Sequence, residues 1–135
     1  MSLELVLEHL YLVVVSCAVV IAVGIPLGIF TYYHGKLGKI VLTAVDLIQT
    51  VPVLAVMGLL MTVFGANSLT VIIAMILYLL LPVVRNTNTG LNHVHPLLKE
   101  TADAMGMNRR QKLVKVEFPL AFPFILTGIR ITVVN

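Results

Sequence analysis

The amino-acid sequence predicts an all-α protein, a polytopic bundle of transmembrane helices. Hydrophobic residues make up 59% of its 135 residues and charged residues 11%, and the mean hydropathy is +1.05. This small number of polar residues cannot cover the surface of a soluble globular protein. Lipid must therefore be part of the solvent. Two long stretches, residues 10–33 and 47–84, contain no Asp, Glu, Lys or Arg. A single cysteine, Cys17, excludes a disulfide framework within the chain.

The first predicted span covers residues 10–33, which are long enough to cross the hydrocarbon core as a helix. Glu4 and Glu8 precede it in place of the basic residues of a signal peptide, so we expect the span to be retained. Gly24, Pro26 and Gly28 near its end admit two interpretations. One is a kink at the proline, and the other is close packing of a neighbouring helix on the small residues.

The uncharged stretch of residues 47–84 is too long for one crossing. Its middle carries Gly-Ala-Asn-Ser at residues 65–68, which is typical of a tight turn between two helices. We therefore predict a second span at residues 41–64 and a third at residues 69–84.

The fourth predicted span covers residues 120–135 and begins after Pro119. It is still apolar where the sequence ends, so we expect this span to be incomplete and the chain to be truncated. Residues 85–119, between the third and fourth spans, are polar and basic, and residues 86–90 are turn formers. The whole chain, residues 1–135, is then one transmembrane domain with one large polar loop.

The basic residues predict how the helices are oriented in a cell membrane. Those of the loops all lie on one side of the predicted membrane, which the positive-inside rule makes cytoplasmic. The N-terminus is then external and the large loop cytoplasmic. The net charge of +3 therefore does not indicate nucleic-acid binding, because the cations are sorted by membrane side rather than gathered in a groove. The loop cations are Lys36, Lys39, Arg85, Lys99, Arg109, Arg110, Lys112 and Lys115.

The large loop contains the signals of a helical hairpin. Pro96 stands at a first helical position and Gly106 follows the last turn, so a short helix is expected between them. Asn108 and Gln111 have the spacing of a capping box for a second helix, and Pro119 limits how far that helix continues. On the first helix, residues at three-to-four spacing form a face that can be buried: Leu97, Leu98, Thr101, Ala102 and Met105.

The same loop resembles the EAA loop of ABC importer permeases, whose pattern is Glu-Ala-Ala, three residues, Gly, nine residues, Ile-x-Leu-Pro. Here Glu100-Thr101-Ala102 is followed by Gly106 at the same spacing and, nine residues later, by Val-Glu-Phe-Pro at residues 116–119. The departures at Thr101, Val116 and Phe118 are mild. Residues 49–52 and 77–91 are also similar to segments of permeases for glycine betaine, carnitine and choline.

The resemblance implies a type I ABC importer permease-like fold and a mechanical role without catalysis, cofactor or metal. Two permease copies would form the pathway for osmoprotectants such as glycine betaine, choline or carnitine. A cytoplasmic ABC ATPase would hydrolyse ATP, and an extracellular or periplasmic binding protein would deliver the solute. The resemblance assigns ATPase coupling to Glu100, Thr101, Ala102, Gly106 and Pro119. Glu100 also has a simpler interpretation, a solvated helix charge.

Charged residues outside the motif leave two interpretations open. Asp46 is expected near the cytoplasmic interface, either solvated or paired, and Arg130, deep in the fourth span, either has a structural partner in the bundle or snorkels to the interface. The cations of the second hairpin helix contact either a partner protein or anionic membrane lipid. These cations are Arg109, Arg110, Lys112 and Lys115.

Two other classes of protein compete with a permease. A small four-helix secondary transporter driven by protons needs a carboxylate within its first span, and residues 10–33 offer none. A membrane anchor whose basic insert binds only lipid remains an alternative. The chain has no phosphate-binding loop ending in Gly-Lys-Ser or Gly-Lys-Thr, so ATP hydrolysis is not expected of it. It has no Trp, and its Tyr and Phe residues are scattered, so no aromatic cage for a quaternary ammonium group is predicted.

Overall fold

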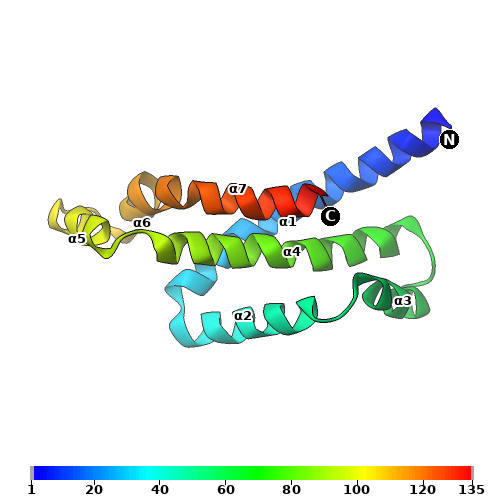
Figure 1. The fold of residues 1–135 in the computed structure, drawn as a ribbon, viewed down its shortest axis with the longest axis horizontal. Coiled ribbons are helices and arrows are strands. Elements are labelled where there is room, and N and C mark those ends of the chain that lie inside the picture. The colour runs from blue at the N-terminus through cyan, green and yellow to red at the C-terminus, as the bar shows by residue number, and fades with distance from the viewer. Residues whose placement is uncertain (1, 135) are drawn as a thin grey trace.

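A computed structural model describes residues 2–134 of the chain, and their regular structure is helical throughout (Figure 1). The all-α prediction is therefore confirmed. Three continuous helical stretches are long and apolar enough to cross a membrane: Leu3–Tyr33, Ser68–His93 and Arg109–Val134. The elements are α1 (Leu3–Tyr33), α2 (Gly35–Gln49), α3 (Val53–Phe64), α4 (Ser68–His93), α5 (Pro96–Ala104), α6 (Arg109–Lys112), the π-helical turn η1 (Leu113–Glu117) and α7 (Phe118–Val134).

Helix α4 is the centre of the bundle. It packs along both α1 and α7, which also contact each other, and it contacts α2 and α3 (Figure 1). Three small apolar clusters join it to α1, α2 and α7, and each contains at least one fully buried α4 side chain. The core is therefore built around side chains of α4. The clusters are Val20, Leu79 and Val83; Val45, Leu81 and Val84; and Leu91, Ala121 and Ile125.

Small residues let α1 and α7 approach α4 closely. A Cβ added at Gly28 would lie 2.5 Å from Thr87 Cβ, and one added at Gly24 would lie 2.7 Å from Val83 Cγ1. On α7, a Cβ at Gly128 would meet the Pro82 carbonyl oxygen at 3.0 Å. The close-packing interpretation of Gly24 and Gly28 is confirmed, and α1 runs unbroken through Pro26.

Residues 86–90 are helical, which contradicts their prediction as a turn. Helix α4 continues to His93, past the predicted end of the third span at residue 84. Local turn propensity is overridden because the polar side chains find partners inside the bundle. Asn86 Nδ2 donates to the Pro82 carbonyl at 2.8 Å, and Asn88 Nδ2 donates across to Thr31 Oγ1 of α1 at 3.0 Å.

Replacing Asn88 with alanine should destabilise the bundle by about 1 kcal/mol, because an interhelical hydrogen bond between buried groups is lost. The free energy of unfolding of the purified protein in mixed detergent micelles measures this loss. Thr62→Ala is the control, since the Thr62 side chain is exposed and donates only to the Leu59 carbonyl of its own helix. Equal stability of the two variants would show that the α1–α4 bond contributes nothing.

The predicted second span, residues 41–64, is not one continuous helix. Helices α2 and α3 meet at a bend of 95° across residues 50–52. Pro52 explains the break, because proline has no N–H to donate and biases the preceding residue towards extended backbone. The next connection agrees with prediction: Gly65 has a φ of +81°, and Asn67 Oδ1 caps α4 by accepting from the Thr70 N–H at 2.9 Å.

The last long helix is continuous from Arg109 to Val134, so the prediction that Pro119 limits the second hairpin helix is wrong. The turn before the proline is π-helical, and the Phe118 N–H bonds to the Leu113 carbonyl, five residues back. A π turn is wider than an α turn, which relieves the clash of the proline ring with the preceding turn. Helix α7 thus begins as an extension of the hairpin.

Candidate functional site

The polar hairpin formed by α5 and α6 lies at one end of the bundle. Figure 1 shows it at the end where α1 passes into α2, and it shows the N-terminus and the α3–α4 turn at the other end. Lys36 and Lys39, at the start of α2, are therefore at the hairpin end. Lys36, Lys39 and the hairpin therefore share one end of the molecule, whereas Arg85 lies inside α4.

Helix α5 has defined start and stop signals, as the sequence predicted. His95 Nδ1 accepts from the Leu97 N–H at 3.1 Å, and Pro96 occupies the first turn. At the other end Gly106 has a φ of +80°, its N–H bonds to the Asp103 carbonyl at 3.0 Å, and the Met107 N–H bonds to the Ala102 carbonyl at 3.2 Å. This pair of bonds is a Schellman motif, in which the glycine takes the left-handed position.

The second arm of the hairpin is capped and tied to the first. Asn108 Oδ1 accepts from the Gln111 N–H at 2.8 Å, and Gln111 Oε1 accepts from the Asn108 N–H at 3.0 Å, so the predicted capping box is confirmed. Lys112 Nζ donates to Asp103 Oδ1 at 2.9 Å across the two arms. The hairpin is therefore held in one shape by its own backbone and side chains.

The apolar face of α5 is only partly covered. Ala102 is buried, but Leu97 is 61% exposed and Met105 is 71% exposed, and Leu98 and Thr101 are exposed as well. The prediction of one buried face therefore holds within the chain for Ala102 alone. Leu97, Thr101 and Met105 are spaced four residues apart, so they form a stripe along α5, called here the α5 stripe. Most of the surface of its apolar side chains is left exposed by the rest of residues 2–134.

The remaining predicted site residues are dispersed. Glu100 and Pro119 are exposed, and Arg110 and Lys115 are exposed without an ion pair among the described residues. Asp46 Oδ2 lies 3.6 Å from the Arg85 guanidinium, and both side chains are about half exposed. Arg130 is exposed on α7, and no ion pair or side-chain hydrogen bond joins it to another described residue.

A cluster that sequence reasoning missed lies where the hairpin meets α1. Glu117, which the motif treats as an unspecified position, is 1% exposed. It lines a cavity of about 460 Å³ with side chains from the end of α1 and both arms of the hairpin. A carboxylate between Val116 and Phe118, at the start of an apolar span, was the available signal. The other lining residues are Tyr32, Tyr33, Asp103, Arg109 and Lys112.

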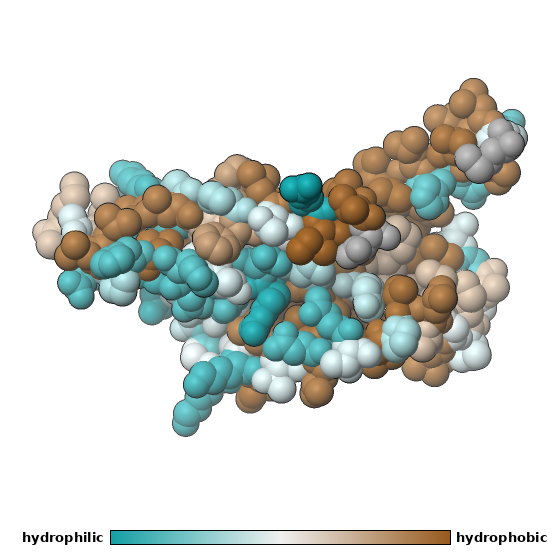
Figure 2. All heavy atoms as spheres, viewed as in Figure 1, coloured by the Kyte–Doolittle hydropathy of each residue, from teal (hydrophilic) through white to brown (hydrophobic). Residues whose placement is uncertain are grey.

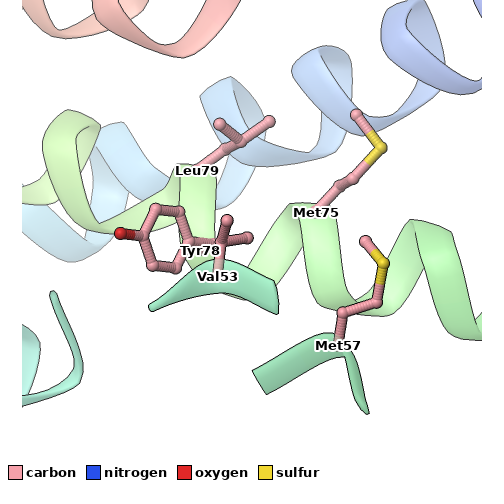
Figure 3. A pocket seen from close by; sticks show the side chains of 5 residues that line it. All are labelled: Val53, Met57, Met75, Tyr78 and Leu79. Carbon is pink, nitrogen blue, oxygen red and sulfur yellow. The ribbon is translucent and has the colours of Figure 1, made fainter. Parts of the chain in front are cut away.

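A second cavity, of about 450 Å³, lies between α3 and α4 (Figure 3). Val53 and Met57 line it from α3, and Met75, Tyr78 and Leu79 line it from α4. Its lining is apolar apart from the Tyr78 hydroxyl. One aromatic ring does not form a cage, so this cavity gives no specific site for a quaternary ammonium group.

A bundle of long apolar helices with a capped polar hairpin at one end defines a multi-pass membrane protein that has a structured extramembrane surface. Apolar side chains are exposed along the first half of α1, as Figure 2 shows, and such a surface suits contact with lipid. The chain belongs to the family described as "Binding-protein-dependent transport system inner membrane component", which matches residues 21–135. This assignment confirms the resemblance to importer permeases. It rules against the two alternatives, a small four-helix secondary transporter and a membrane anchor.

Relatives with 35–43% identity carry the names of permeases for osmoprotectants. The chain is 40% identical over 136 residues to the osmoprotectant import permease protein OsmW of Salmonella typhimurium, covering 97% of this chain and 63% of the relative. It is 43% identical over 112 residues to the glycine betaine/carnitine/choline transport system permease protein OpuCD of Bacillus subtilis, covering 83% of this chain and 49% of the relative. The chain thus spans about half to two thirds of these relatives.

The fold is that of a solved importer. The structure titled "Inward facing conformations of the MetNI methionine ABC transporter" superposes with a TM-score of 0.83 at 22% identity, over 99% of this chain and 72% of that one. This similarity confirms the predicted type I ABC importer permease fold.

Proposed function

We propose that this chain forms part of the membrane-spanning subunit of an ATP-driven importer and that its hairpin docks on a cytoplasmic ATPase. The observation that carries the proposal is the α5 stripe. Leu97 and Met105 are exposed on a helix that is capped at both ends. A salt bridge between Lys112 and Asp103 ties this helix to α6. Exposed apolar side chains on a rigid helix suit insertion into a groove of another protein.

The residues that the EAA resemblance assigns to coupling have different positions in the hairpin, and each position suits a different part in docking. Ala102 lies on the buried side of α5, where a small residue allows close packing on the rest of the chain. Gly106 closes the helix, and Glu100 and Thr101 are exposed where a partner can reach them. Pro119 lies in the continuous helix that carries the hairpin into the bundle, so it acts as part of the connection rather than as a contact.

The names of the relatives support glycine betaine, carnitine or choline as the solute class. Two permease copies would form the pathway, and a substrate-binding protein on the outer side would deliver the solute. The hairpin end is then cytoplasmic and the N-terminus external, in agreement with the position of Lys36 and Lys39. Lys112 is paired with Asp103, and Arg109 lies over the Tyr33 ring. Arg110 and Lys115 are therefore the cations left to contact anionic lipid headgroups. The Asp46–Arg85 pair joins α2 to α4 structurally, and Arg130 is assigned to a neighbouring subunit or the interface.

The test of docking is substitution of Gly106 in the full-length permease co-expressed with its ATPase. Gly106→Leu should lower the amount of co-purified ATPase about 5- to 30-fold, because a branched residue at positive φ costs about 1–2 kcal/mol of the hairpin conformation. Gly106→Asn should retain most of it, since asparagine tolerates this backbone region.

Gly58→Leu is the matched control. A Cβ at either glycine meets no atom within 4 Å, but Gly58 lies in helix α3 and has ordinary helical backbone. Unchanged recovery of the ATPase with Gly106→Leu, in a permease that still inserts in the membrane, would contradict the docking role of the hairpin.

A further inference from the structure

The last two residues of α1 lie between the two arms of the hairpin. Lys99 Nζ of α5 lies 4.8 Å from the centre of the Tyr32 ring, and the Arg109 guanidinium carbon of α6 lies 4.7 Å from the centre of the Tyr33 ring. Both distances are within the range of cation–π attraction. The end of the first span is therefore in contact with both arms of the hairpin at once.

The hairpin arms themselves are tied together and to α4. Lys112 and Asp103 bridge the arms, and Lys99 Nζ also donates to the Leu91 carbonyl near the end of α4 at 3.1 Å. A pull on α5 is consequently shared by α6 and reaches Tyr32 and Tyr33. Tyr32 and Tyr33 are the α1 side chains that the Lys99 and Arg109 cations of the hairpin contact.

Glu117 gives this contact a second possible state. The Glu117 Oε2 atom and the Tyr33 hydroxyl are both buried, both groups line the same cavity, and neither atom has a hydrogen-bond partner within residues 2–134. A buried hydroxyl and a buried carboxylate oxygen that lack hydrogen-bond partners are both unfavourable, and a bond between them would relieve both costs.

We propose that Tyr32, Tyr33 and Glu117 are positioning residues that transmit movement of the hairpin to α1. This inference rests on the proposed docking of the hairpin. When docking on the ATPase shifts the hairpin relative to α1, the Tyr33 hydroxyl donates to Glu117, and the new bond stabilises the shifted arrangement. A contact made in only one of two arrangements shifts the balance between them, which is the property that coupling requires.

Transport per ATP hydrolysed is the readout, because a purely structural role leaves this ratio unchanged. The full-length permease is reconstituted in liposomes with its ATPase and binding protein, and uptake of labelled glycine betaine, carnitine and choline is measured beside ATP hydrolysis. Tyr33→Phe removes the hydroxyl but keeps the ring under Arg109. We expect it to lower solute moved per ATP at least five-fold with unchanged co-purification of the ATPase.

Two variants of Glu117 separate hydrogen bonding from charge. Glu117→Leu should lower the ratio as Tyr33→Phe does, whereas Glu117→Gln, which still accepts a bond, should keep at least half of it. Tyr11→Phe and Glu8→Gln, both exposed in the first half of α1, are the matched controls and should leave the ratio unchanged.

An unchanged ratio in Tyr33→Phe would overturn this inference while leaving ATPase docking intact. A ratio lowered equally by Tyr11→Phe would also overturn it, since the effect would then not be specific to the contact of Tyr32, Tyr33 and Glu117 with the hairpin. A wild-type permease that fails to bind its ATPase at all would instead overturn the proposed function, and this inference with it.

Discussion

Replacing Gly28 with leucine should abolish accumulation of the folded protein. A Cβ at this position would lie 2.5 Å from Thr87 Cβ, 2.8 Å from Thr87 Cγ2 and 3.0 Å from the Val84 carbonyl oxygen. Thr87 and Val84 are fully buried in α4, so neither can move aside without shifting the helix. Overpacking of this kind costs about 1–3 kcal/mol, and a leucine clashing with backbone belongs at the upper end. The yield of monodisperse protein in mild detergent measures the loss.

The smaller substitution Gly28→Ala should already reduce this yield, because the Cβ alone makes the clash. Gly58→Leu should have no such effect, since no atom lies within 4 Å of a Cβ there. Equal yields of Gly28→Leu and Gly58→Leu would show that α1 and α4 are not as close as described.

The double variant Leu97→Glu with Met105→Glu should reduce binding of the cytoplasmic ATPase at least 100-fold. Each of these side chains contributes about 1.5–3 kcal/mol when it passes from water to an apolar groove, and a carboxylate in its place removes that gain. Together the losses exceed the 2.8 kcal/mol or so that corresponds to 100-fold in affinity. Titration of the purified permease with its ATPase gives the dissociation constant directly.

Leu37→Glu provides the comparison for this double variant. Leu37 is 56% exposed and lies in the first turn of α2, at the same end of the bundle but outside the hairpin. It should leave ATPase affinity unchanged. If the double variant binds as tightly as wild type, the α5 stripe is not the docking surface, and a lipid-facing role for the hairpin becomes the better account.

The hairpin was predictable from sequence because its signals are local. Gly106, Asn108 and Gln111 act through hydrogen bonds to backbone within a few residues, and Pro96 acts through its fixed φ, so their spacing alone carries the structure. The exposure of Leu97 and Met105 was not predictable, because periodicity shows that a face is apolar and not what covers it.

Other features depended on contacts between distant segments. The turn-forming residues 86–90 became helical because Asn88 meets Thr31, which lies 57 positions earlier in the chain. The cluster around Glu117 requires the end of α1 to lie beside η1, and nothing in either segment alone indicates the other. Pro52 lies at the break between α2 and α3, but α1 and α4 run on through Pro26 and Pro82, so a proline alone does not tell from sequence which helix will be interrupted.

The 95° bend between α2 and α3 has a consequence for the environment of this part of the bundle. Hydrocarbon chains offer no hydrogen-bond donor or acceptor, so an interrupted backbone ladder at bilayer depth is stable only against protein or water. Residues 50–52 are exposed in the isolated chain. If they lie at that depth, this side of the bundle is turned away from the acyl chains, towards a second polypeptide or a hydrated passage.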